Sequence, residues 1–150
     1  MSSYFATIEW ALGEGDFLAG RYSRYHTIRF DGAVAPGSAS PHNVPEPYAV
    51  AEAIDPEEMF VASLSACHML WFLDYAKRAG IVVESYVDQA SGVLAKDERG
   101  LMVMTEVVLR PKVVLADPLR APELEGVHHR AHEACFIANS VKTEVRVEPA

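Results

Sequence analysis

The sequence predicts an α+β fold whose elements follow the order ββ-α-ββ-α-β. Two observations support this prediction. One long helical pattern with start and stop signals covers residues 55–80, and segments with the pattern of strands lie on both sides of it. This element order is typical of α+β proteins. A chain of 150 residues has the length of one domain, so we expect a single domain over residues 1–150.

The predicted central helix has signals at both of its ends. Asp55 is a favourable N-cap residue, and Pro56 follows at the first helical position. Glu58 stands three residues after the cap, as in a capping box. Gly80 is a natural stop, because glycine readily adopts the left-handed conformation that follows many helices. We therefore expect the helix to begin directly after Asp55 and to end just before Gly80.

Residues 59–73 leave this helix almost no polar face. A helix that is apolar on all sides is expected to be buried on all sides. One small sheet can cover one side, so a second copy of the chain is the expected source of the remaining cover. A membrane span is the alternative, which we reject. Ser63, Ser65 and His68 interrupt the apolar run, and a span needs ~20 apolar residues.

Two strands are expected before the helix, at residues 4–12 and 21–30, joined as a hairpin through a glycine-containing turn at residues 13–16. Residues 31–54 carry four prolines and no clear periodicity. We expect them to form a long loop without regular structure, and loops of this length are often functional lids.

The second predicted strand carries an arginine on its expected core face. Ile28 and Phe30 make one face the more apolar, and the period of two places Arg24 and His26 on that same face. A buried arginine needs a partner, so Arg24 is a candidate for function. The alternative is that Arg24 reaches solvent past the end of the strand.

The C-terminal half is expected to hold a hairpin, a helix and a final strand. Residues 82–94 and 101–115 are rich in valine and predict the hairpin, in which Pro111 indicates a bend or an edge. After a proline-containing loop, residues 123–135 predict the shorter helix and residues 141–147 the last strand.

The composition excludes several classes of partner. A net charge of −8 and a pI near 5.2 argue against nucleic acid, which requires a basic face. No basic run indicates a membrane surface. The N-terminal segment has neither the charged nor the apolar region of a secretion signal, so we expect a cytoplasmic location. Two cysteines do not make a stabilising framework, so they are free buried thiols, a redox pair or metal ligands.

The two cysteines are the residues best suited to carry chemistry. Cys67 lies in the middle of the apolar helix between small residues, and Cys135 lies where the second helix gives way to a loop. The alternative is that each is simply a small core side chain. Because burial raises the pKa of a thiol, a thiolate in an apolar site needs a cation. Arg24 is the best available cation, and His26 and His68 are weaker candidates.

A metal site is a competing interpretation. His128, His132 and Cys135 are spaced by four and three residues on one predicted helix, so they share a face. With Cys67 as a fourth ligand, this spacing suits zinc. The alternative for the histidines is an exposed polar face of the helix.

Two segments resemble the OsmC/Ohr family, the osmotically inducible protein C and organic hydroperoxide resistance proteins. Residues 55–69, DPEEMFVASLSACHM, are similar to the helix motif of that family, and residues 131–145, AHEACFIANSVKTEV, resemble its second cysteine segment. The element order agrees over nearly the whole chain. His68 stands where the family more usually has an aromatic residue, which places the chain in a divergent branch and bears on substrate preference.

The resemblance implies an OsmC/Ohr-like fold with a long buried central helix, assembled as an intertwined homodimer. It implies that Cys67 is the thiol that attacks a peroxide and that Cys135 is the thiol that resolves the product as a disulfide. Glu57, the third residue of the DPE motif, is the implied carboxylate of the site.

The resemblance also implies an arginine at the site, although its position does not align firmly. The strand-face argument selects Arg24, with Arg21 and Arg29 next. Glu57 and Cys67 are ten residues apart on one helix, or ~15 Å along its axis. The glutamate can therefore help the thiol only through the arginine or from the other subunit.

The expected function is that of a thiol-dependent peroxidase acting on organic hydroperoxides. A Cys67 thiolate becomes a sulfenic acid, Cys135 condenses with it to a disulfide, and an external dithiol reduces that disulfide. This chemistry needs no cofactor or metal. The alternatives are the zinc site and a non-catalytic dimer that senses redox state or binds a hydrophobic ligand.

Overall fold

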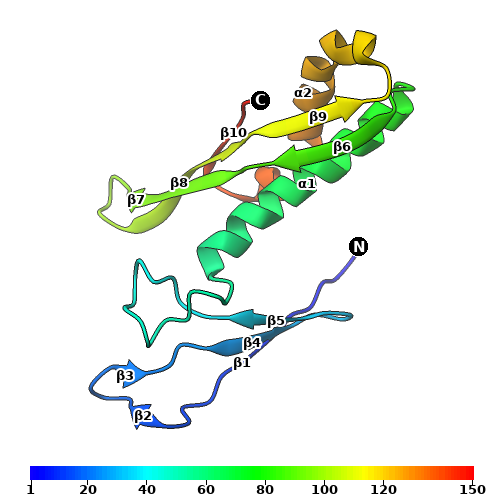
Figure 1. Ribbon diagram of the computed structural model, residues 1–150. Coiled ribbons are helices and arrows are strands. Elements are labelled where there is room, and N and C mark those ends of the chain that lie inside the picture. The colour runs from blue at the N-terminus through cyan, green and yellow to red at the C-terminus, as the bar shows by residue number, and fades with distance from the viewer. The chain divides into compact units, whose positions relative to one another are not determined.

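The computed structural model describes residues 1–150, and the chain divides into two compact units, Met1–Met59 and Phe60–Ala150 (Figure 1). The first unit holds five strands and the start of helix α1 (Pro56–Arg78), and the second holds the rest of α1 with all later elements. The combination of two α-helices with several sheets confirms the predicted α+β class. The assignment of the whole chain to one domain stays a prediction.

The first unit is built on an antiparallel sheet in the order β1–β4–β5. Ile8 lies opposite Ile28 in this sheet, so the predicted pairing of the first two segments is confirmed. A short pair of strands, β2 and β3, forms where the sequence predicts a turn and the start of a strand. The strands are β1 (Thr7–Glu9), β2 (Gly15–Asp16), β3 (Arg21–Tyr22), β4 (His26–Arg29) and β5 (Val34–Gly37).

The strand predicted over residues 21–30 is interrupted in its middle. A ring nitrogen of His26 lies 2.9 Å from the Arg24 carbonyl, and local bonds of this kind compete with strand pairing. Ile28 is buried as predicted. The prediction for Phe30 is wrong: β4 ends one residue earlier, and Phe30 is 45% exposed in the turn toward β5.

Residues 31–54 are more regular than predicted. Strand β5 lies within them and pairs with β4, and Ile54 returns to form a parallel bridge with Gly37. The prolines of this segment argue against a strand when only the sequence is considered. Pro36 is tolerated because β5 is an edge strand, where a missing backbone N–H breaks no ladder bond.

Both predicted ends of the central helix are confirmed. Asp55 Oδ1 accepts a hydrogen bond from the Glu58 N–H over 2.7 Å, and Glu58 Oε2 accepts one from the Asp55 N–H over 3.0 Å. These two bonds form a reciprocal capping box. After the helix, Gly80 has a φ of +70° and donates its N–H to the Lys77 carbonyl, as in a Schellman motif.

Within one chain, α1 buries a stripe of every fourth residue, namely Leu64, His68, Phe72 and Ala76. Leu70, outside this stripe, is 62% exposed. By length and composition alone the helix could cross a membrane, but the core helix of a soluble protein passes the same test. Cover of the remaining faces by a second copy of the chain stays a prediction.

The segments predicted as a hairpin after α1 do pair along their length, but each is divided in two. The division falls at Arg110, whose N–H donates to Asp88 Oδ1 over 2.6 Å, and Pro111 begins the next strand where a bend was predicted. β10 joins β8 in parallel. The strands are β6 (Val83–Asp88), β7 (Ser91–Lys96), β8 (Met102–Leu109), β9 (Pro111–Leu115) and β10 (Glu144–Val147).

Helix α2 (Leu124–Ala134) lies beside α1 in the second unit, next to the β6–β9 pair (Figure 1). Their shared core contains Phe72 and Ala76 of α1 and Val127 and Ala131 of α2. A short 3-10 helix, η2 (Ala138–Ser140), follows α2 and leads toward β10. The two helices that carry the cysteines therefore pack directly on each other.

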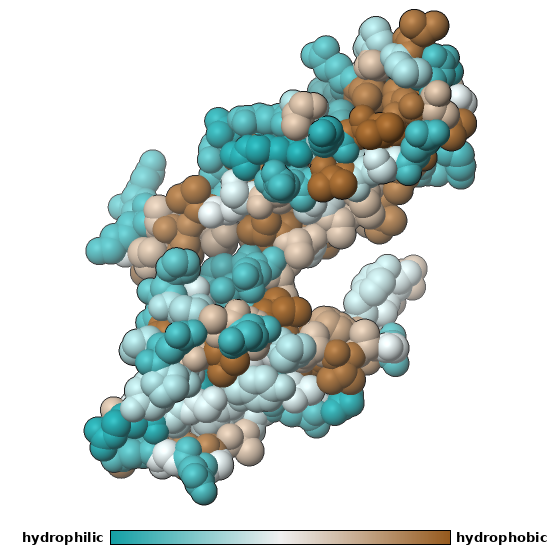
Figure 2. All heavy atoms as spheres, in the orientation of Figure 1, coloured by the Kyte–Doolittle hydropathy of each residue, from teal (hydrophilic) through white to brown (hydrophobic).

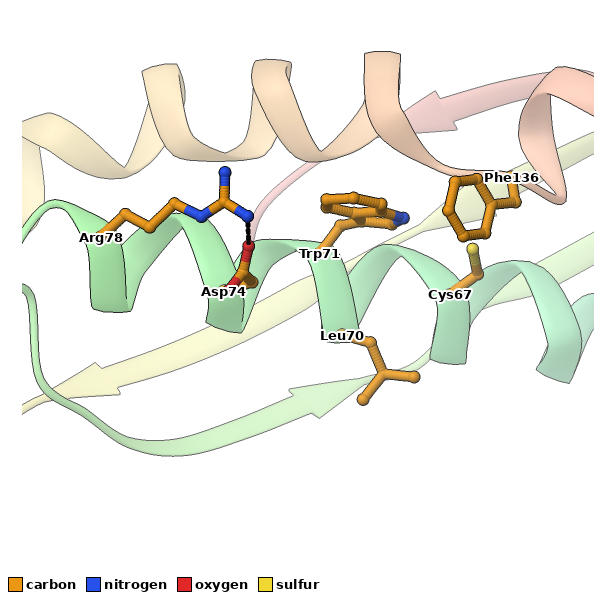
Figure 3. Close-up of a pocket in the computed structure, with 6 residues that line it drawn as sticks. All are labelled: Cys67, Leu70, Trp71, Asp74, Arg78 and Phe136. Atoms are coloured by element: carbon orange, nitrogen blue, oxygen red, sulfur yellow. Dashed lines mark ion pairs between the residues drawn. The ribbon is translucent and has the colours of Figure 1, made fainter.

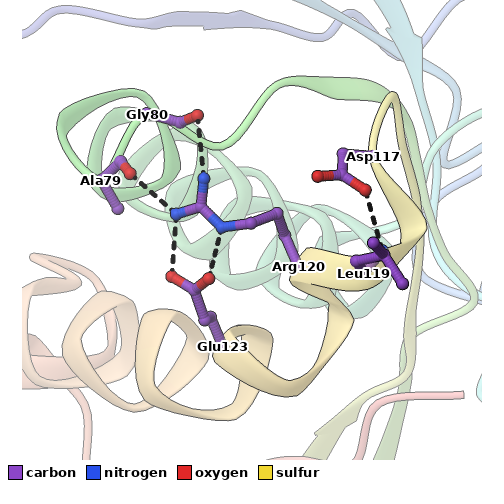
Figure 4. A network of polar contacts seen from close by, with 6 residues as sticks. All are labelled: Ala79, Gly80, Asp117, Leu119, Arg120 and Glu123. Carbon is purple, nitrogen blue, oxygen red and sulfur yellow. Dashed lines mark hydrogen bonds and ion pairs between the residues drawn. The ribbon is translucent and has the colours of Figure 1, made fainter.

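A second 3-10 helix, η1 (Pro118–Glu123), replaces the loop predicted before α2. Its Arg120 donates to the Ala79 carbonyl over 3.0 Å and to the Gly80 carbonyl over 3.4 Å, and it pairs with Glu123 (Figure 4). Their mutual hydrogen bond raises the pKa of Arg120 and lowers that of Glu123. A positive charge at the C-terminal end of α1 also suits the helix dipole.

Large apolar side chains are exposed on the first unit, among them Tyr4, Phe5, Ile8, Trp10 and Leu18. Figure 2 shows apolar side chains on the visible surface of both units. Clusters of exposed apolar side chains are typical of interaction surfaces.

Candidate functional site

Cys67 opens onto a pocket of about 330 Å³ in the second unit (Figure 3). Helix α1 supplies most of its wall, and the segment after α2 supplies the rest. The lining residues are Cys67, Leu70, Trp71, Asp74, Arg78 and Phe136. The sulfur points toward an aromatic wall, and the Asp74–Arg78 ion pair, 2.5 Å long, lies at the far end. The surroundings of the thiol are therefore apolar.

Cys135 is the buried neighbour of Cys67. It is 1% exposed and caps the C-terminal end of α2 in an extended conformation. Burial raises the pKa of the Cys135 thiol to about 11; a hydrogen bond from the Ala138 N–H opposes this shift, and a hydrogen bond with the Cys67 side chain adds to it. At neutral pH, Cys135 is therefore a protonated thiol beside Cys67.

Both thiols are free, and the fold brings them together from different helices. This arrangement agrees with the expectation that the two residues form a pair. The role of each thiol stays a prediction.

Phe136 links the segment of Cys135 to the pocket of Cys67, because it lines that pocket. It follows Cys135 directly, is 67% exposed, and makes an edge-to-face contact with Trp71 at a centroid distance of 5.3 Å. Movement of Cys135 would therefore displace part of the wall beside Cys67. The sequence argument missed Phe136, although an aromatic residue next to a candidate cysteine was a usable signal.

The least expected feature is a buried pair of histidines. His68 Nε2 lies 3.0 Å from His128 Nδ1, and the two rings are parallel within 5°. Burial lowers the pKa of each to about 4; the charges of His128 and His132 lower that of His68 further, whereas Asp88 opposes the shift of His128. His68 is thus neutral at pH 7 and is a hydrogen-bonding partner rather than the cation considered from the sequence.

The alternative zinc site does not form. His128 Nδ1 faces His68, and no three histidine, cysteine, aspartate or glutamate side chains come together in a group that could hold a metal ion. The spacing on α2 predicted a shared face correctly for His128, but that face is turned into the core, where His128 is buried.

The three candidate arginines differ in their partners within the first unit. Arg21 pairs with Asp16, and Arg29 pairs with Glu9, each over 3.0 Å. The Arg24 guanidinium instead donates to the carbonyls of Gly20 and Tyr22, at 2.8 and 2.6 Å, and stacks on the Tyr22 ring. No carboxylate neutralises Arg24.

Glu57 and Glu58 also differ in whether their carboxylates have hydrogen-bond partners. Glu58 is occupied by the capping box, whereas Glu57 Oε2 is buried and has no hydrogen-bond partner. A buried carboxylate oxygen without a partner is costly, so it calls for a donor that the isolated chain does not supply.

Comparison with known proteins identifies the family. A family model described as OsmC-like protein matches residues 49–150, which include both cysteines. The chain belongs to the OsmC family. An OsmC-like protein of unknown function from Vibrio cholerae O1 biovar eltor str. N16961 is 48% identical over 100% of both chains, with a TM-score of 0.96. No curated protein matches the chain.

More distant OsmC relatives share the fold. An organic hydroperoxide resistance protein from Elizabethkingia anophelis is 18% identical, with a TM-score of 0.71 over 99% of this chain and 94% of that one. The organic hydroperoxide resistance protein OhrB of Bacillus subtilis is 20% identical, with a TM-score of 0.68 over 99% of this chain and 98% of that one. The predicted membership of the OsmC/Ohr family is confirmed.

Proposed function

We propose that this OsmC-family protein is a thiol-dependent peroxidase that reduces organic hydroperoxides to alcohols. The observation that carries the proposal is the Cys67 thiol on an apolar pocket with the Cys135 thiol as its direct neighbour. Two adjacent thiols can accept the oxidising equivalents of a peroxide and keep them as a disulfide. The fold shared with organic hydroperoxide resistance proteins supports this class of substrate.

The proposed cycle has three steps. The Cys67 thiolate attacks the terminal oxygen of the hydroperoxide, so that an S–O bond forms, the O–O bond breaks, and the departing alkoxide takes up a proton to become the alcohol. The sulfenic acid of Cys67 then condenses with the Cys135 thiol, forming the S–S bond and releasing water. An external dithiol reduces this bond by two exchange steps and is itself oxidised to a disulfide.

The walls of the pocket favour an organic substrate over hydrogen peroxide. Leu70, Trp71 and Phe136 present apolar surface beside the sulfur. An alkyl or aryl group that covers this surface gains about 25 cal/mol for each Å² of apolar area removed from water. Hydrogen peroxide has no group that can make this contact.

We propose that Arg24 supplies the cation for the thiolate and that Glu57 holds that arginine. Only neutral partners surround Arg24, so its positive charge remains available, unlike the charges of Arg21 and Arg29. The unpartnered oxygen of Glu57 is suited to accept a hydrogen bond from a guanidinium.

A homodimer is part of the proposal. The exposed side of α1 and the exposed apolar residues of the first unit provide surface for a second copy. Sedimentation should show a dimer at micromolar concentration, and a stable folded monomer would contradict this. We also propose a cytoplasmic location, where a reducing thiol pool keeps both cysteines free.

Stopped-flow oxidation of the reduced protein tests the function. Cumene hydroperoxide should oxidise Cys67 faster than hydrogen peroxide does, and added dithiol should give many turnovers. Cys67→Ser is the control for reaction elsewhere in the chain. A single oxidation that no dithiol reverses would favour a redox sensor, and the absence of any preference for the organic peroxide would remove the proposed substrate class.

A further inference from the structure

We infer that the His68–His128 pair positions Cys135 against Cys67 and thereby governs formation of the disulfide. The inference rests on the proposed function, because it concerns the second step of that cycle. It assigns a positioning role to two residues that do not line the substrate pocket of Cys67.

Apart from the bond between the two cysteines, the pair is the only side chain–side chain hydrogen bond that joins α1 to α2 and its C-cap. His68 follows Cys67 directly on α1. His128 lies two turns before Cys135 on α2, since seven residues separate them. The bond therefore fixes α2 against α1 close to the point where the two sulfurs meet.

The surroundings make this bond specific. His68 and His128 are 1% and 5% exposed, and Phe72 stacks on the His128 ring at a centroid distance of 4.3 Å. In a neutral imidazole one ring nitrogen donates and the other accepts. We assign the donor to His68 Nε2 and the acceptor to His128 Nδ1, which leaves His68 Nδ1, buried without a partner, as an acceptor. Removing either ring leaves a buried polar atom of the other ring without its hydrogen-bond partner.

Disulfide formation is sensitive to this placement. The Cα atoms of two cysteines must lie within ~7 Å of each other, so a small shift of one helix along the other takes the pair out of range. Apolar contacts between the helices are not directional, whereas a hydrogen bond between two rings constrains both their distance and their orientation. We therefore infer that this bond helps to set the register of α2 against α1.

The reduction potential of the cysteine pair tests the inference without any peroxide. Wild type, His68→Phe and His68→Gln are equilibrated in dithiol–disulfide redox buffers, and the Cys67–Cys135 disulfide is measured by peptide mass spectrometry. Phenylalanine removes the donor while keeping an aromatic ring, and glutamine keeps a donor. We expect the equilibrium constant for disulfide formation to fall about tenfold in His68→Phe, which is about 30 mV toward a more oxidising potential, and to stay near wild type in His68→Gln.

Two further variants complete the comparison. His129→Gln is the matched control, because His129 is an exposed histidine on the same helix, and it should leave the potential unchanged. His128→Phe removes the same bond from the other side, so the test survives if His68→Phe does not fold. An unchanged potential in the folded phenylalanine variant would overturn the inference, and so would an equal shift in His68→Gln.

The outcomes separate this inference from the proposed function. If wild type forms no Cys67–Cys135 disulfide in the redox buffer, both fall. If the disulfide forms and the phenylalanine variants shift its potential, the positioning role stands, even where peroxide is not reduced and the peroxidase proposal fails.

Discussion

The two helices that carry the cysteines are held in different ways. Helix α1 has 23 residues, with a reciprocal capping box at one end and a Schellman motif at the other. Helix α2 has 11 residues, no side-chain hydrogen bond at its N-cap, and an end at Cys135, where the backbone turns extended. Cys67 lies in the middle of the well-capped helix, whereas Cys135 is the residue directly after the last position of the other.

This difference suits different steps of the proposed cycle. Attack on a peroxide requires a thiol with a fixed direction, and a position inside a capped helix supplies it. Condensation requires one sulfur to approach the other, and Cys135 is held to α2 by a single backbone hydrogen bond, to the His132 carbonyl over 3.3 Å. We therefore expect Cys67 to act first and Cys135 to move.

Exchange of each cysteine tests this order, and its effect is the largest we expect. Cys67→Ser should abolish reaction with organic hydroperoxide. Cys135→Ser should still react once and then stall as a sulfenic acid, which over-oxidises with further peroxide. Peptide mass spectrometry after a pulse of one equivalent of peroxide distinguishes the two. Oxidation of Cys135 before Cys67 would reverse the proposed roles.

Removal of the Arg24 charge should have the next largest effect. The two thiols differ because Cys135 is kept protonated by burial, whereas the proposed cation serves only Cys67. Arg24→Met should slow oxidation of Cys67 on the order of 100-fold, by analogy with the loss of one charge-stabilising donor. Stopped-flow measurement would show this.

Arg21→Met and Arg29→Met are the matched controls, since both arginines are already paired with carboxylates. They should react at nearly the wild-type rate. A slow Arg21 or Arg29 variant together with a normal Arg24→Met variant would move the role to that residue.

The contact between the two helices should weaken in acid. His68 and His128 have pKa values lowered to about 4, so the unfolded chain binds more protons than the folded chain between that pH and ~6.5. The stability that the neutral histidine pair contributes is therefore fully present above pH ~6.5 and decreases as the pH falls toward 4. His68 alone should contribute a loss of about 1.4 kcal/mol per pH unit.

Urea unfolding at pH 7 and pH 5 measures this loss. His68→Phe should show a smaller difference between the two pH values than wild type. His129→Gln should match wild type, because His129 is exposed. Asp88 and His132 also face the pair, and the comparison between variants holds their contributions constant.

Sequence and structure agree best where the signal is local. Asp55, Glu58 and Gly80 belong to short motifs whose hydrogen bonds are made within a few residues, and each was predicted correctly. Strand β5 was not predicted, because its edge position, which makes Pro36 acceptable, depends on the order of strands in the sheet.

The site shows the same limit. The two cysteines could be singled out from their segments, but the histidine pair could not, because His68 and His128 meet only once α2 packs on α1. The spacing of His128 and His132 was read as a zinc face since a helical face can be predicted from sequence, whereas its orientation toward the core cannot.

The smallest expected effect concerns the caps themselves. Asp55→Ala should lower the free energy of unfolding by about 1 kcal/mol, because it removes the acceptor of the capping box. Glu125→Ala, in the first turn of α2, should change it by at most a few tenths, since no side-chain cap exists there. Equal losses in urea unfolding would show that the two helices are held alike.

The Arg120 contacts have a consequence for motion along α2. They join the Ala79 and Gly80 carbonyls, directly after α1, to Glu123, the residue just before α2. The first turn of α2 therefore cannot unfold without breaking the contacts to the end of α1. At the other end, the Asn139 amide donates to the Glu133 carbonyl over 2.9 Å, and this bond ties α2 to the segment that follows it. We therefore expect local unfolding of this helix to start at its Cys135 end and to run backward, so that the free energy needed to expose each amide rises from the thiol toward Arg120.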